Sequence, residues 1–89
     1  AVERILASYR GRGLEFHAVR SRQAAARRFV TMHVLVPGDW TVHRGHELLE
    51  RIEHEIRNVV PNCTVLTHLE PVEDPRSFDD IELDRRPVA

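Results

Sequence analysis

A chain of 89 residues with a net charge of −1 forms one small domain, whose limited core is often supplemented by a metal or a partner chain. The single cysteine, Cys63, excludes an internal disulfide and is typical of a reducing compartment. The balanced charge excludes a general attraction to nucleic acid, and no apolar stretch is long enough for insertion into a membrane.

The first part of the chain predicts a helix followed by two strands. Apolar residues recur with helical spacing at Val2, Ile5, Leu6 and Tyr9. Gly11 and Gly13 then end the helix. Residues 14–22 form a strand, and residues 28–36 carry the strongest strand signal because they are rich in β-branched side chains. The short connection between the two strands, residues 23–26, indicates an antiparallel hairpin.

A second helix follows the turn formed by residues 37–39. Thr41 is a suitable N-cap for this helix, which we expect to run to about Val59 before Pro61 ends it. Its predicted apolar stripe consists of Val42, Gly45, Leu49, Ile52, Ile56 and Val59. This stripe is the surface that should pack against a sheet.

The order α-β-β-α-β predicts an α+β fold with a three-stranded mixed sheet. Residues 63–69 form the third strand, which a right-handed crossover through the second helix places parallel to residues 28–36. The second strand is then central, both helices cover one face of the sheet, and the other face is open. We expect the folded domain to span residues 1–70. Residues 71–89, rich in proline and acid, should form an extended or disordered tail.

Alternation of side chains along the strands places four metal-ligating residues on the open face. The unbroken apolar set of the central strand, from Val30 to Val36, belongs under the helices. His17, His33, His68 and Glu70 then point the other way, from three neighbouring strands. Because adjacent strands lie about 4.8 Å apart, these side chains can converge on one ion. Imidazole and carboxylate suit zinc and its first-row neighbours, although a strand histidine can also be a hydrogen-bonded structural residue.

The same alternation leaves Phe29, Leu35 and Leu66 on the open face, where a single chain would expose them to water. Contiguous apolar surface of this kind marks an association surface, so we predict a homodimer through or beside this face. His46 lies at the edge of the second helix's stripe, and His43 and His54 point toward solvent. No phosphate-binding loop or nucleophile motif is recognisable, so we expect a binding domain and not an enzyme.

Four short motifs, in order, resemble one known family. Residues 16–22, 29–33, 42–46 and 67–71 are similar to the first strand, central strand, helix opening and last strand of the cytosolic C-terminal domain of cation diffusion facilitator transporters. The resemblance runs from about residue 2 to residue 71. It implies a ferredoxin-like, metallochaperone-like domain on the cytoplasmic side of a membrane. Its partners would be a second copy and the transmembrane domain of the same transporter.

The resemblance also implies which residues bind metal. His17, His33 and Glu70 match a site within one subunit, whereas His68 and Glu70 match a second site that His46 of the partner subunit completes. Glu70 would then bridge two ions, although many relatives carry the shorter Asp there. The ligands accept zinc, cobalt, nickel, cadmium, iron or manganese.

The implied role is to sense cytosolic divalent metal and to regulate efflux by drawing two subunits together. Because the chain does not begin with Met, we expect it to be a fragment or a processed chain. Two alternatives stay open: a stand-alone metallochaperone-like module, and a purely structural dimerisation domain.

Overall fold

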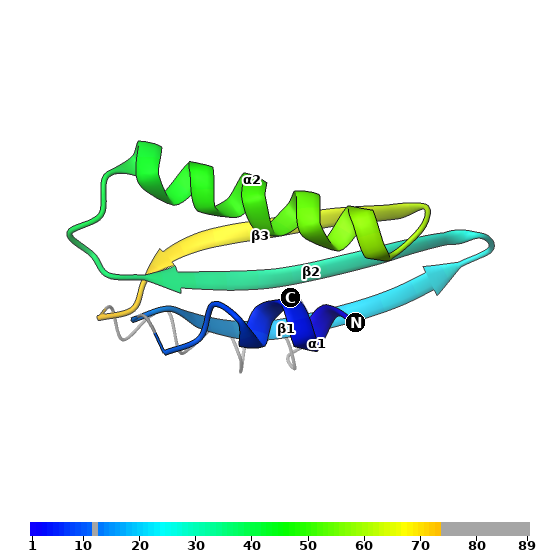
Figure 1. Cartoon of the computed structure of the whole chain (residues 1–89), viewed down its shortest axis with the longest axis horizontal. Coiled ribbons are helices and arrows are strands. Elements are labelled where there is room, and N and C mark those ends of the chain that lie inside the picture. Colours follow the sequence, from blue (N-terminus) through cyan, green and yellow to red (C-terminus); the bar gives the residue numbers. More distant parts are fainter. Residues whose placement is uncertain (12, 74–89) are drawn as a thin grey trace, which may run out of the picture.

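The computed structural model describes residues 1–11 and 13–73. Its elements are α1 (Val2–Ala7), β1 (Glu15–Ala24), β2 (Arg27–Val36), α2 (Val42–Val59) and β3 (Cys63–Pro71). Figure 1 shows α2 alongside β3, and α1 contacts α2. The predicted order α-β-β-α-β is confirmed. Most of the predicted tail, residues 74–89, lies outside the described residues.

The sheet has the predicted mixed topology, with β2 in the centre. β1 pairs with β2 antiparallel, and β2 pairs with β3 parallel. The hairpin is longer and its turn tighter than expected, because Ala24 already pairs with Arg27. Only Ala25 and Ala26 connect the strands, and Ala25 has a φ of 55°.

The hydrophobic core lies between the sheet and the two helices. Alternate residues of β2 point into it, as the alternation predicted. Buried members come from every element of the chain: Leu6, Tyr9, Leu14, Phe16, Val30, Met32, Val34, Val36, Leu48, Ile52, Ile56, Val60 and Val65. The face of the sheet that the two helices cover is therefore the apolar face.

Helix α2 begins and ends at the predicted residues, but its buried stripe differs from the expected one. The Thr41 hydroxyl accepts a hydrogen bond from the Arg44 N–H at 3.1 Å, which caps the helix. Val42 and Val59, at its two ends, are 83% and 53% exposed. The buried positions are Gly45, Leu48, Ile52 and Ile56. The predicted stripe was wrong at Val42 and Val59, which are exposed, and it did not include buried Leu48.

Gly45 brings the start of α2 close to β3. A Cβ added at this residue would collide with the side chain of Leu69. Glycine allows this close approach, and any larger residue would require the Leu69 side chain to move. The contact fixes the position of the first turns of α2, which carry His43 and His46.

A β-bulge interrupts β1 after His17. His17 pairs with His33, but the next printed pair joins Arg20 to Thr31, so β1 holds one extra residue between them. Ala18 takes up the irregularity with a φ of 53°. Because paired residues point to the same side of a sheet, the bulge directs Arg20 to the same face as His17. A regular strand would have sent it under the helices.

Candidate metal site

Three histidines form one row across the open face of the sheet. His17 on β1 is in register with His33 on β2, which is in register with His68 on β3. Since residues paired across neighbouring strands point to the same side, all three imidazoles lie on the face that the helices leave open. The predicted placement of the strand histidines is therefore confirmed.

Glu70 contacts the central histidine of this row. Its Oε2 lies 3.0 Å from Nδ1 of His33, and the two side chains are 24% and 19% exposed. The ring of His68 packs edge-on against that of His33, with centroids 5.3 Å apart. The carboxylate of Glu70 and the imidazole of His33 are therefore close enough to reach the same point on the open face.

Glu70 and the three histidines of the row do not form a complete set of metal ligands within one chain. Among residues 1–11 and 13–73, no group of three His, Cys, Asp or Glu side chains is close enough to hold an ion. His33 and Glu70 are in contact, whereas His17 and His68 are their neighbours in register. A third ligand would have to come from a side-chain rotation or from a second chain.

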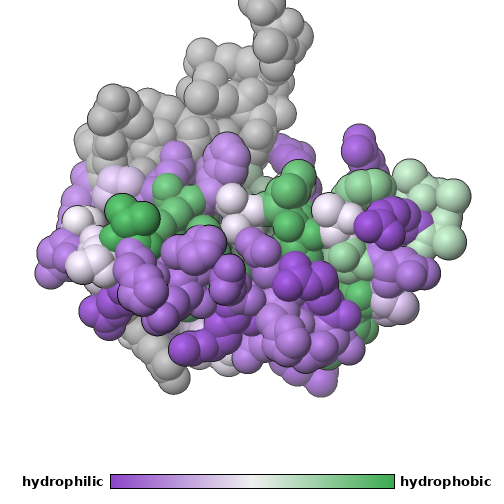
Figure 2. All heavy atoms as spheres, turned by 90° about the horizontal axis from the view of Figure 1, so that it is seen from above, coloured by the Kyte–Doolittle hydropathy of each residue, from purple (hydrophilic) through white to green (hydrophobic). Residues whose placement is uncertain are grey.

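His46 stands apart from the row, on helix α2. Its Nε2 lies 3.0 Å from the Oε1 of Glu50, and its side chain is 65% exposed. His43 makes the same contact with Glu47, one turn apart on the helix, and is 82% exposed. Figure 2, which looks down on the α2 side, shows a largely hydrophilic surface with separate hydrophobic patches. The predicted solvent exposure of His43 is confirmed, and the role of His46 stays a prediction.

The apolar residues expected on the open face have three different outcomes. Leu66 is 61% exposed, as predicted, and Phe29 is half-buried. Leu35 is completely buried, so the expectation that water reaches it is wrong. Alternation gives the direction of a side chain, but it does not say what lies over it.

Sequence reasoning missed the bulge and its consequence for the arginines. Ala18 carries the positive φ, and alanine gives no signal for that conformation. The bulge gathers Arg20 and Arg22 on the same face as the histidine row. Within the described residues, no helix is long and apolar enough to cross a membrane.

The sequence is similar to those of known cation transport proteins. A family model for the cytoplasmic domain of cation efflux proteins matches residues 1–72. Over 70 residues the chain is 50% identical to an uncharacterized transporter from Synechocystis sp., a match that covers 79% of this chain. The chain spans only 23% of the length of that relative.

Solved structures of related domains have the same fold. The metal-bound C-terminal domain of the CzcD transporter from Thermotoga maritima matches with a TM-score of 0.72 and 26% identity, over 83% of this chain and 86% of that one. A domain of CzrB, studied as a zinc transporter, matches with a TM-score of 0.67 and 36% identity, over 79% and 90% of the two chains. Its zinc form matches with a TM-score of 0.69 and 35% identity, over 82% and 86%.

Proposed function

This chain belongs to the cytoplasmic-domain family of cation efflux proteins, and we propose that it binds a divalent metal to regulate an efflux transporter. The observation that carries the proposal is the contact between His33 and Glu70 within a row of histidines. A carboxylate beside several imidazoles suits zinc and similar ions, and it balances part of their charge. The role is binding and regulation, and not catalysis.

Two sites use the ligands of the open face. His17, His33 and Glu70 bind one ion within a subunit once a side-chain rotation brings the three together. His68 and Glu70 bind a second ion, together with His46 of the partner subunit. The residues fit such ions by donor chemistry, and the metal-bound CzcD domain and the zinc form of CzrB are related structures that support the proposal. Zinc is the first metal to test; cobalt, nickel, cadmium, iron and manganese accept the same donors.

Metal acts by favouring a homodimer of the domain. A ligand shifts a conformational equilibrium only when it binds one state better than the other. A site that needs ligands from two chains meets this condition, because it is complete only in the pair. Exposed Leu66 supplies apolar surface on the same face. The pairing of the two domains would then alter the transmembrane domain of the same transporter.

Calorimetric titration of zinc into the wild type and two variants tests the ligand assignment. Glu70→Ala should weaken zinc binding at both sites, because the same carboxylate serves both ions. Glu47→Ala is the matched control, since Glu47 contacts exposed His43 on α2 and is absent from the proposed sites. Unchanged stoichiometry and affinity in Glu70→Ala would contradict the assignment.

Sedimentation with and without zinc separates the regulatory domain from the two alternatives. The proposal expects zinc to strengthen the dimer, and His46→Ala to remove only this effect. A dimer that is indifferent to zinc would indicate a structural dimerisation domain. Zinc binding by a protein that stays monomeric would favour a stand-alone metal carrier.

A further inference from the structure

The β1–β2 hairpin forms one end of the molecule and extends past the rest of the sheet. β3 begins at Cys63, which pairs with Arg28, so residues 24–27 lie beyond the third strand. Figure 1 shows this tip near the end of α2, with the β2–α2 connection at the opposite end of the sheet. Residues 20–28 are all exposed. The tip is therefore a projection that can contact another surface end-on.

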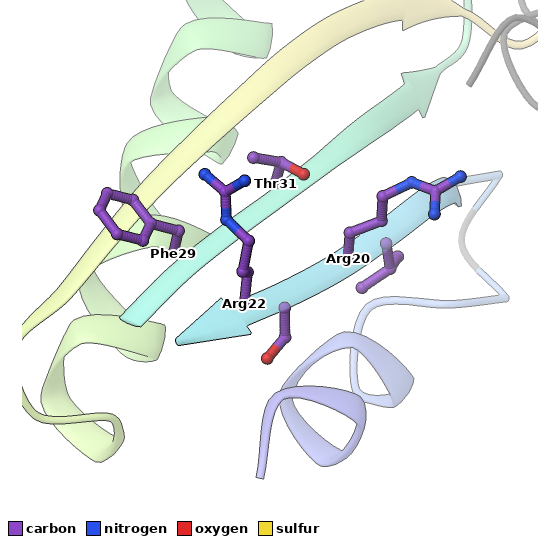
Figure 3. A pocket seen from close by; sticks show the side chains of 6 residues that line it. Arg20, Arg22, Phe29 and Thr31 are labelled. Carbon is purple, nitrogen blue, oxygen red and sulfur yellow. The ribbon is translucent and has the colours of Figure 1, made fainter. Parts of the chain in front are cut away.

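Three arginines surround this tip. Arg22 pairs with Phe29 and Arg27 pairs with Ala24, which places both arginines on the open face, whereas Arg28 points to the other side of the sheet. Figure 3 shows Arg22 rising from β1 beside Phe29, and its guanidinium lies 5.6 Å from the centre of that ring. Within the described part of the chain, none of the three arginines forms an ion pair. Their charges are therefore available to a partner.

The segments around the tip contain no acid. Residues 16–38 include the hairpin, residues 56–69 include the end of α2 and most of β3, and neither range contains Asp or Glu. The Arg28 N–H donates to the Asn62 carbonyl at 2.9 Å, which holds the two segments together. Arg57 adds a cation in the last turn of α2, where it pairs with a glutamate one turn earlier at 3.6 Å. We call the hairpin tip, residues 22–28, together with residues 57–62 the basic end.

Carboxylates gather at the opposite end of the sheet. Glu15 begins β1 and Glu70 lies near the end of β3, and both are in register with the end of β2. Asp39 follows β2, and the Glu73 carboxylate accepts hydrogen bonds from the backbone between β2 and α2. The ten residues of β2 separate the two ends by about 30 Å at ~3.3 Å per residue. Because the screening length is ~10 Å at 0.1 M salt, a surface that touches the basic end is screened from these acids.

We propose that the basic end docks on the anionic lipid headgroups of a membrane, an inference that rests on the proposed function in an efflux transporter. The cations lie on both faces of the hairpin, so a flat surface met end-on contacts all three, whereas a bound peptide strand would contact one face. Guanidinium groups pair with phosphate through two hydrogen bonds. The turn residues 24–26 are alanines, whose small side chains let the backbone approach the headgroups. Docking orients the domain with the hairpin toward the bilayer.

Co-sedimentation of the intact chain with vesicles, in a chelator and without metal, tests the docking. The protein should bind phosphatidylserine mixed with phosphatidylcholine more tightly than phosphatidylcholine alone. Each arginine near an anionic surface strengthens binding about fivefold, so Arg27→Gln with Arg28→Gln should weaken it about 25-fold. Arg44→Gln with Arg51→Gln, on α2, changes the net charge equally and should have a much smaller effect. Equal binding to the two kinds of vesicle, or equal losses in the two double variants, would overturn the proposal.

Quenching by headgroup spin-labelled lipids tests the orientation. Cys63→Ser removes the native thiol, and Ala26→Cys then carries a fluorescent label at the tip. Trp40 reports on the opposite end, since it lies between β2 and α2. The lipids should quench the label and leave the emission of Trp40 unchanged. Quenching of Trp40 to the same extent as the label would refute the end-on arrangement.

Two further measurements separate the membrane from other acidic partners. Tighter binding to soluble polyglutamate than to the vesicles would assign the basic end to an acidic protein and overturn the proposal. Self-association at low salt that Arg27→Gln with Arg28→Gln removes would do the same, because the acidic end of a second copy would then be the partner. This double variant should bind zinc as the wild type does. A failure of membrane docking is therefore distinct from a failure of the proposed metal binding.

Discussion

The two faces of the sheet differ in what holds their side chains in place. On the helix side, residues such as Val34, Ile52 and Ile56 are completely buried among apolar neighbours. On the open side, His33 and Glu70 meet each other near solvent, and Arg22 covers an aromatic ring. The first face holds the domain together by packing. The second face carries charged and metal-ligating side chains, and these side chains contribute little to the packing of the core.

The energies of the two faces differ accordingly. Burying one aliphatic side chain contributes about 1.5 to 3 kcal/mol. A partly exposed ion pair contributes about 0 to 1 kcal/mol. The open face can therefore be specialised for a ligand without a large cost in folding stability. Substitutions on the two faces should separate stability from binding.

The largest expected effect is loss of packing on the helix side. Ile56→Ala removes a completely buried side chain, so the free energy of unfolding should fall by about 2 to 5 kcal/mol. Urea denaturation followed by circular dichroism measures this change. Val42→Ala, at a position 83% exposed on the same helix, should change it by less than about 0.5 kcal/mol. Equal losses in the two variants would contradict the assignment of the core.

The next effect tests the contact between α2 and β3. Gly45→Ala forces a Cβ against Leu69 and should lower the free energy of unfolding by about 1 to 3 kcal/mol. The same change in a Leu69→Ala background should cost less, because the colliding side chain is gone. A double-mutant cycle measured by urea denaturation gives this difference. Because alanine has a higher helix propensity than glycine, an identical cost in both backgrounds would show that something other than the collision with Leu69 sets it.

Most of the fold could be predicted because its signals are local. Apolar periodicity located the helices, and alternation in residues 28–36 placed β2 under them correctly. The ends of α2 were also predictable, from Thr41 and Pro61. The buried stripe was not, because the angle at which a helix crosses a sheet is a property of the whole packing. The local sequence pattern predicts which side of a helix packs on the sheet, but it does not predict which residues along that side are buried.

The candidate site was predictable as a face but not as a geometry. The alternation of side chains along the strands placed His17, His33 and His68 on one face, and the strand register confirmed that they form a row. The contact between His33 and Glu70 depends on side-chain rotation, which alternation does not describe. The bulge at Ala18 has no sequence signal, so the arginine side of the open face was missed. Site chemistry is therefore easier to predict than site geometry.

A smaller effect of opposite sign is expected in the hairpin turn. Ala25 has a φ of 55°, which costs an alanine more than a glycine. Ala25→Gly should therefore raise the free energy of unfolding by about 0.5 to 1 kcal/mol. Ala26→Gly is the matched control, and it should stabilise nothing, because Ala26 has no positive φ. Thermal melts of the two variants measure this difference. An equal gain in stability in both variants would contradict the turn geometry.

The variant with the largest expected effect on metal binding should have the smallest effect on the free energy of unfolding without metal. His33→Ala removes a partly exposed contact, so the free energy of unfolding without metal should change by no more than about 1 kcal/mol. Zinc at about 100 times its dissociation constant should stabilise the wild type by about 2.7 kcal/mol. His33→Ala should lose most of that gain, because the central ligand of the row is absent.

His43→Ala provides the control for this last comparison. It removes an imidazole that is 82% exposed and paired with Glu47 on the helix. Its stability without metal should also be nearly unchanged, but it should keep the full gain with zinc. Urea denaturation of the three proteins, each with zinc and with a chelator, gives all six values. If His33→Ala kept the zinc gain, the row would be a structural feature of the sheet. The separation between a packed face and a binding face would then fail.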